Sequence, residues 1–146
     1  MITETISDAA KAIVRRNTEE VQSGGNFAVF DELFSNDFVD HTPQEGCAPN
    51  KEGARALYQG IRSAFPDFRG EIHWQSVAGD LVTTYKTYHG THHGSFLGVE
   101  PTRRKVSFEC VDVMRVWNGK IVEHWGVANI FSLMRQLSGG DLLAIP

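Results

Sequence analysis

The sequence predicts an α+β domain in which helices come first and a mostly antiparallel sheet follows. Apolar residues recur at helical spacing as far as Phe65, and after Pro66 the period shifts towards two residues. Asn118-Gly119 joins two segments of alternating character, which predicts a hairpin with a tight turn because both residues tolerate positive φ. The chain has 146 residues, 41% of them hydrophobic, which suits one domain with one core over residues 1–146.

Capping and stop signals bound the predicted helices. Gly24-Gly25 ends the first amphipathic segment, Asn50 can cap a later one, and Pro66 ends that later helix. The predicted helices are Ile6 to Val21, Phe27 to Phe34, Asn50 to Phe65 and Ile130 to Leu137. The predicted strands are Phe38 to His41, Gly70 to Val77, Leu81 to Thr91, Lys105 to Trp117 and Lys120 to about Asn129.

The strand from Lys105 to Trp117 has an apolar side that contains one carboxylate. This inward set is Val106, Phe108, Cys110, Asp112, Met114 and Val116. An acid on the inward face of a sheet needs a partner or a proton, so Asp112 is the first candidate for chemistry. It could be a general acid/base with a raised pKa, or one half of a structural ion pair. Lys86 could supply the cation, but the even polarity of its strand favours an exposed Lys86.

Several motifs together resemble the SnoaL-like polyketide (ester) cyclase family. They are Gly90 to Gly98, Pro101 to Arg104 and Met114 to Gly126, with Phe38 to Pro43, Phe65 to Phe68 and Leu133 to Leu137 in family order and spacing. The resemblance covers nearly the whole chain. It implies the nuclear-transport-factor-2-like cone, a curved, mostly antiparallel sheet wrapped around helices, with a pocket in its mouth.

The same resemblance implies acid/base chemistry on a small molecule in that pocket. His41 matches a position where family members often place a polar residue or a histidine, and a His41–Asp112 pair would make an acid/base unit. The expected catalytic residues are therefore Asp112 and His41. The expected substrate-binding residues are Phe38, Tyr58, Trp74, His92, Phe108, Met114, His124, Gly126 and Asn129. For His92, the shaping of a strand end is the competing interpretation.

Gly126 departs from the family pattern. Cyclases of this family commonly carry an aspartate there, which serves as acid/base in an intramolecular aldol closure. Asn129 stands where many relatives have another acid, but an amide cannot act as a base at neutral pH. Two functions remain open. One is an enzyme that cyclises, isomerises or eliminates on a small, largely apolar carbonyl substrate by means of another base. The other is a pocket that binds small molecules without turnover.

Composition disfavours other classes of function. A net charge of −4 and a pI near 5.8 argue against a nucleic-acid surface. The apolar runs are too short to span a membrane, and the polar, acidic start is unlike a signal peptide, so a cytoplasmic protein is expected. The sequence contains no CxxC, HExxH, GxGxxG or Walker pattern, so neither a metal nor an organic cofactor is expected. Cys47 and Cys110 are expected to be free thiols.

A homodimer is the expected assembly. Trp125 lies on the opposite side of its strand from His124 and Gly126. Trp117 and Val113 share that side on the neighbouring strand. Large apolar side chains on the outer face of a curved sheet are typical of a contact between subunits.

Overall fold

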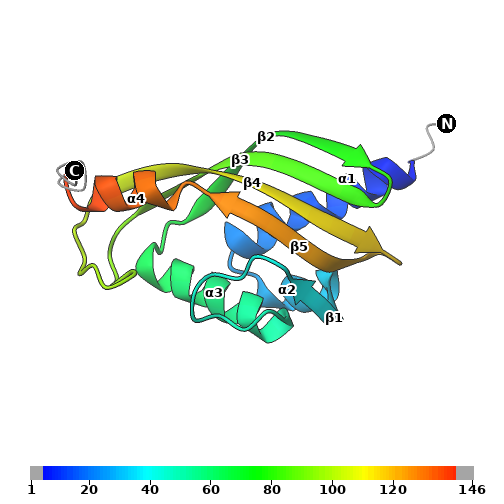
Figure 1. Ribbon diagram of the computed structural model, residues 1–146, viewed down its shortest axis with the longest axis horizontal. Coiled ribbons are helices and arrows are strands. Elements are labelled where there is room, and N and C mark those ends of the chain that lie inside the picture. The colour runs from blue at the N-terminus through cyan, green and yellow to red at the C-terminus, as the bar shows by residue number, and fades with distance from the viewer. Residues whose placement is uncertain (1–4, 141–146) are drawn as a thin grey trace.

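The computed structural model describes residues 5–140, in which helices pack beneath a curved sheet (Figure 1). Within this range the helices are α1 (Ile6–Arg16), the π-helical turn η1 (Asn17–Gln22), α2 (Phe27–Leu33), α3 (Lys51–Ala64) and α4 (Ile130–Leu137). The strands are β1 (Phe34–Asp40), β2 (Arg69–Ala78), β3 (Leu81–Thr91), β4 (Lys105–Trp117) and β5 (Lys120–Ala128). Every element predicted from the sequence is present, so the predicted α+β class is confirmed.

Local side-chain chemistry sets the ends of these elements. The carboxamide oxygen of Asn50 accepts a hydrogen bond from the Gly53 amide at 2.9 Å, which is the predicted cap of α3. Asn118 and Gly119 have φ values of 50° and 74°, which confirms the tight turn between β4 and β5. One prediction needs correction, because the first helix is α-helical only to Arg16 and then widens into η1. The spacing of apolar residues does not distinguish an α-helix from a π-helical turn, so this change of helical period could not be predicted from it.

The five strands of the described chain form one sheet in the order β1-β5-β4-β3-β2. Neighbouring strands are antiparallel, except that β1 runs parallel to β5. Side chains alternate across β3 and β4, and the even-numbered positions of both strands face the helices and are buried. The parity of a residue on these strands therefore decides whether it can reach the interior.

Two groups of buried apolar side chains hold the helices against the sheet. One group joins α1, α2 and the start of α3 to β1, around Phe30, Phe34 and Phe38. The other joins the end of α3 and α4 to β3 and β4, around Phe65, Phe108 and Leu133. Residues from both groups line a single cavity, which therefore lies between them inside the curve of the sheet.

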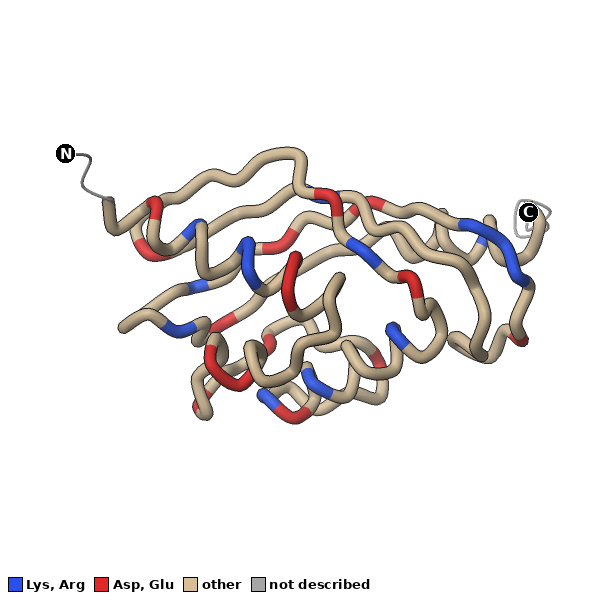
Figure 2. The backbone as a smooth tube through the Cα atoms, turned by 180° about the vertical axis from the view of Figure 1, so that it is seen from behind, with Lys and Arg blue, Asp and Glu red and all other residues tan. Residues whose placement is uncertain are grey.

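Charged residues are distributed along the whole backbone. Figure 2 shows Lys and Arg interspersed with Asp and Glu on the side seen from behind, with one short basic run at Arg103 to Lys105. Among residues 5–140, no helix combines the length and apolar character that crossing a bilayer requires.

Candidate functional site

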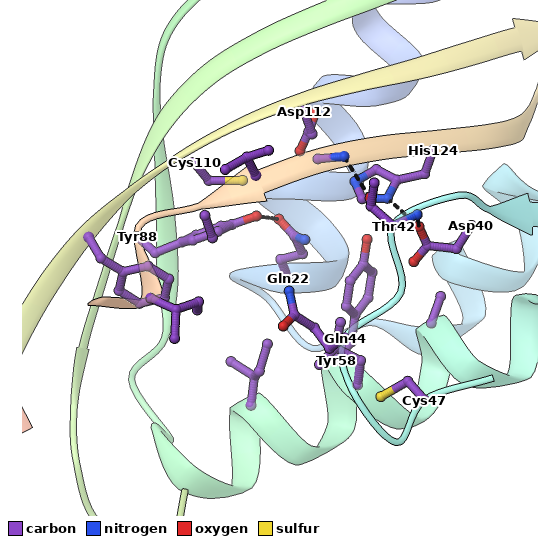
Figure 3. Close-up of a pocket in the computed structure, with 18 of the residues that line it drawn as sticks. Gln22, Asp40, Thr42, Gln44, Cys47, Tyr58, Tyr88, Cys110, Asp112 and His124 are labelled. Carbon is purple, nitrogen blue, oxygen red and sulfur yellow. Dashed lines mark hydrogen bonds and ion pairs between the residues drawn. The ribbon is translucent and has the colours of Figure 1, made fainter. Parts of the chain in front are cut away.

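A cavity of about 220 Å³ opens between α3, the loop after β1 and the inner face of the sheet (Figure 3). Its walls are mainly apolar and aromatic, including Phe38, Tyr58, Ile61, Phe68, Tyr88 and Phe108. A few polar side chains enter it, among them Gln22, Asp40, Asp112 and His124. An apolar pocket with a small number of convergent polar groups is the usual form of a small-molecule site.

A buried ion pair forms the back of the cavity. Lys86 has no exposed surface, and its ammonium lies 3.0 Å from Oδ2 of Asp112. The expectation of an exposed Lys86 is therefore wrong. Lys86 pairs in register with Cys110 and has the same parity as Asp112, so the strand carries it inward despite the polar residues around it. Burial is the largest single influence on Lys86 and opposes its charge, but attraction to Asp112, Cys110 and Tyr58 together raises the pKa of Lys86 above its ordinary value.

Only one oxygen of Asp112 is used by the ion pair. Its Oδ1 is buried and has no hydrogen-bond partner among residues 5–140. In the register of β4 and β5, Asp112 stands directly opposite Gly126. A carboxylate from the neighbouring strand thus faces the position at which the sequence lacks one, and its second oxygen is available for a proton.

A second pair of titratable side chains joins β1 and β5. Nδ1 of His124 lies 2.9 Å from Oδ1 of Asp40, and the two residues are partners in the parallel β1–β5 pairing. Burial is the largest single influence and would raise the pKa of Asp40, but the hydrogen bond and charge of His124 together with hydrogen bonds from Thr42 hold it below its usual value. Because Nδ1–H donates to this carboxylate, Nε2 of His124 carries the lone pair. Asp40 was not among the site residues expected from the sequence.

Gly126 makes room for this histidine. A Cβ at residue 126 would lie 2.8 Å from Nε2 of His124 and 3.3 Å from Cβ of Asp112. Nε2 therefore occupies the space beside residue 126, close to Asp112 as well. The glycine that interrupts the family pattern is what permits the imidazole to lie there.

His41 does not pair with Asp112. It alternates with Asp40 along the chain and so lies on the other side, where its ring stacks on Trp125 with centroids 4.6 Å apart. Its Nε2 contacts Oε2 of Glu123 at 2.7 Å. The expected His41–Asp112 unit is thus replaced by His124 with Asp40, because strand alternation sends Asp40 rather than His41 into the cavity.

The structure divides the expected binding residues. Those on the cavity wall are Phe38, Tyr58, Phe108, His124 and Gly126. Trp74 is 50% exposed on the outer face of the sheet beside Tyr85, so it lies outside the cavity.

Met114 is buried in the apolar core, and Asn129 caps α4 through its side-chain oxygen. His92 is also buried outside the cavity, where its Nδ1 accepts a hydrogen bond from the Thr102 amide. Met114, Asn129 and His92 therefore stabilise the fold around the site.

The polar groups from η1 were also missed from the sequence. Asn17 donates to the Tyr58 hydroxyl at 3.0 Å, while Thr18 and Gln22 each accept from Lys86 at 3.1 Å. Burial raises the pKa of Tyr58 to about 12, so this phenol stays protonated at neutral pH. A signal for these residues exists, since Thr18 and Gln22 are four residues apart and would share a helix face.

Among the described residues, the cysteines and the potential metal ligands do not form a second candidate site. Burial raises the pKa of Cys110 to about 11, which leaves a protonated thiol of low nucleophilicity. Cys47 lies in the loop at the cavity rim and is also free. Within residues 5–140, no group of three His, Cys, Asp or Glu side chains is placed to hold a metal ion.

The sequence of this chain is similar to those of known polyketide cyclases. The family model for SnoaL-like polyketide cyclase matches residues 12–137. The nogalonic acid methyl ester cyclase of Streptomyces nogalater is 37% identical over 59 residues, which are 40% of this chain and 44% of that protein. The chain thus matches less than half the length of that curated relative.

Solved structures resemble the fold over nearly its full length. IdmH, a candidate polyketide cyclase of Streptomyces antibioticus, is 28% identical, with a TM-score of 0.78 over 88% of this chain and 98% of that one. AclR, a candidate hydroxylase of Streptomyces galilaeus, is 29% identical, with a TM-score of 0.79 over 89% and 81% of the two chains. A candidate polyketide cyclase of Bacillus cereus is 26% identical, with a TM-score of 0.79 over 90% and 81%.

Proposed function

This chain belongs to the SnoaL-like polyketide cyclase family, and from that premise we propose that it is an acid/base enzyme acting on a small, largely apolar carbonyl compound. The reaction is proton abstraction from the carbon next to a carbonyl, followed by intramolecular aldol closure. The observation that carries the proposal is Asp112 on the cavity wall opposite Gly126, whose Oδ1 has no hydrogen-bond partner within residues 5–140.

Asp112 is the proposed base. Lys86 forms an ion pair with Oδ2 and orients the carboxylate, while Oδ1 makes no hydrogen bond within residues 5–140 and is the oxygen proposed to take the substrate proton. The absence of an aspartate at residue 126 would by itself favour a pocket that binds without turnover. We favour an enzyme instead, because Asp112 on the neighbouring strand supplies a carboxylate opposite Gly126.

His124 is the proposed proton relay. The enolate carbon formed by Asp112 attacks a second carbonyl of the same molecule, and the resulting alkoxide must regain the proton that Asp112 took. Nε2 of His124 lies beside residue 126 and close to Asp112, where it can pass that proton on. Asp40 fixes the tautomer and orientation of the ring, as a carboxylate does in other histidine-based sites.

The charges around the cavity favour an uncharged substrate. Asp40, Asp112 and Glu45 contribute carboxylates to its lining. The guanidinium of Arg62 is committed to the backbone carbonyls of Gln22 and Ser23, each at 2.8 Å. A methyl ester would enter this site without the repulsion that a free carboxylate would meet, so an aromatic polyketide methyl ester is the proposed substrate class.

The first test removes the proposed base. Asp112→Asn should lower turnover of an aromatic polyketide methyl ester, or of a simpler enolisable ketone, by about 10²–10⁴-fold because the amide cannot accept the proton. The substitution also leaves Lys86 buried without its counter-ion, which costs about 3–5 kcal/mol. Stability must therefore be measured alongside activity by chemical denaturation.

A double variant separates the two effects. Asp112→Asn combined with Lys86→Met removes both buried charges, so the free energy of unfolding should recover while activity stays low. Asp80→Asn is the matched control, because Asp80 pairs with Arg115 outside the cavity and should leave turnover unchanged. Parental activity in the stable double variant would remove Asp112 from the reaction.

A further inference from the structure

The π-helical turn η1 brings a carboxamide into the cavity. Asn17, Thr18 and Gln22 of this turn are all buried, and Gln22 lines the cavity wall. Short π-helical segments recur at functional sites because they re-aim side chains that an α-helix would place elsewhere. In Figure 3, Gln22 reaches into the cavity with its oxygen towards the Tyr88 hydroxyl.

The orientation of this carboxamide follows from its partners. Lys86 Nζ donates to Oε1 of Gln22 at 3.1 Å, and the Tyr88 hydroxyl donates to the same oxygen at 3.3 Å. An ammonium has protons to give and no lone pair to accept, so the oxygen of Gln22 must face Lys86. The amide nitrogen then takes the opposite side. The hydrogen bonds from Lys86 and Tyr88 both use Oε1 of Gln22, so Nε2 lies on the side of Tyr58 and keeps a proton to donate to a ligand in the cavity.

We propose that Nε2 of Gln22 is the catalytic hydrogen-bond donor to the substrate oxygen that becomes an enolate. This inference rests on the proposed function and assigns its missing electrophilic partner. As Asp112 takes the proton from carbon, negative charge develops on the carbonyl oxygen, and a fixed donor inside this largely apolar cavity stabilises it. Lys86 contacts both Asp112 and Gln22, so one ammonium orients the base and polarises the donor.

Three of the expected substrate-binding residues also carry hydrogen-bond donors, but they fit this role less well. Asn129 and His92 lie outside the cavity, as described above. Tyr58 does line it, but its hydroxyl is bonded to Asn17 and burial raises its pKa to about 12, which makes it a weaker acid than an ordinary phenol. Gln22 alone among these residues combines a place on the cavity wall with an amide polarised by a cation.

The kinetic test uses two substitutions at one position. Gln22→Met keeps the volume and removes the donor, and should lower kcat by about 10²–10³-fold with little change in KM. Gln22→Glu keeps an oxygen for Lys86 but offers no N–H, so it should be at least as impaired. Recovery of activity in Gln22→Glu would show that Gln22 acts only by holding Lys86, and would overturn the proposal.

Gln75→Met is the matched control. Gln75 is a half-buried glutamine that donates to the Lys11 carbonyl and to Thr84, but it lies on β2 away from the cavity. Its loss removes hydrogen bonds from the fold without touching the site, so kcat should stay near the parental value.

A spectroscopic test does not depend on turnover. The carbonyl stretch of 2-acetylnaphthalene, labelled with carbon-13 at the carbonyl, should move to lower frequency on binding to the parent protein. Gln22→Met should bind the ketone without that shift, and Gln75→Met should behave as the parent. An equal shift in the parent and Gln22→Met would overturn the role of Gln22 while leaving Asp112 as the base. A ketone that fails to bind the parent would contradict both proposals.

Discussion

At residue 126, a side chain and an imidazole compete for the same space. Any Cβ there would press on Nε2 of His124, whose other nitrogen is held by Asp40. The ring would have to leave Asp40 or the strand would have to move. A side chain at residue 126 therefore requires the His124 ring to shift from its present position, and the glycine spares it that shift.

Gly126→Ala tests this exclusion. We expect turnover to fall by about 10²-fold, because the proton relay moves by an ångström or more from its working position. Nitrogen NMR of His124 should show loss of the hydrogen bond at Nδ1. Gly126→Asp should fall in the same way instead of gaining activity. Gly60→Ala is the control, since a Cβ there meets no atom within 4 Å. Unchanged His124 resonances in Gly126→Ala would contradict the steric argument.

At the scale of elements, the site depends on how α3 docks against its neighbours. Gly94 follows the His92-His93 pair and lies against the last turn of α3, where its amide and that of His93 both donate to the Ala64 carbonyl. A Cβ on Gly94 would stand 2.6 Å from the Ser63 carbonyl oxygen. This glycine thus permits a close backbone approach at one end of the cavity wall.

Two glycine-to-alanine changes should have opposite effects on stability. Gly94→Ala should destabilise the protein by about 1–3 kcal/mol, because backbone has to move to admit the methyl group. Gly60→Ala, in the middle of α3 and facing open space, should stabilise it by about 0.5–1 kcal/mol through helix propensity. Chemical denaturation of both variants measures the difference. Equal effects of the same sign would show that the contact at Gly94 is not tight.

At the scale of the whole molecule, an apolar row crosses the outer face of the sheet. Trp74, Tyr85, Val111 and Val127 are register partners on four successive strands, on the side away from the helices. Trp74, Val111 and Val127 are exposed, as is Trp117 near the end of β4. Trp125 stacks against His41, whereas the row leaves three of its side chains exposed.

We propose that this row is the contact between two copies of the chain. Val111→Asp should then convert a dimer into a monomer in sedimentation velocity. In a symmetric interface each copy would contribute one such charge, so two unpaired carboxylates would be buried. Ile6→Asp is the control, since Ile6 is an exposed apolar residue on α1, away from the sheet face. A parent protein that sediments as a monomer, or a dimer that survives Val111→Asp, would rule out this surface.

The sequence by itself determined the order and type of the elements. Periodicity, the Asn50 cap, Pro66 and the Asn118-Gly119 turn are local signals, and each acts within a few residues of itself. They also identified Asp112, because the parity of β4 is strongly apolar around it. The parity of β3 gave no such contrast, since polar residues occupy both of its sides, and Lys86 was consequently assigned to the wrong face.

Only the tertiary structure decided which groups meet. The Asp40–His124 pair depends on a parallel contact between strands that are 80 residues apart in the chain, and no local pattern encodes that register. The inward turn of Gln22 depends on a change of helical period at Asn17, which apolar spacing does not record. Both follow from the closing of the sheet over the helices, because that packing selects which side of each strand and helix loses its water.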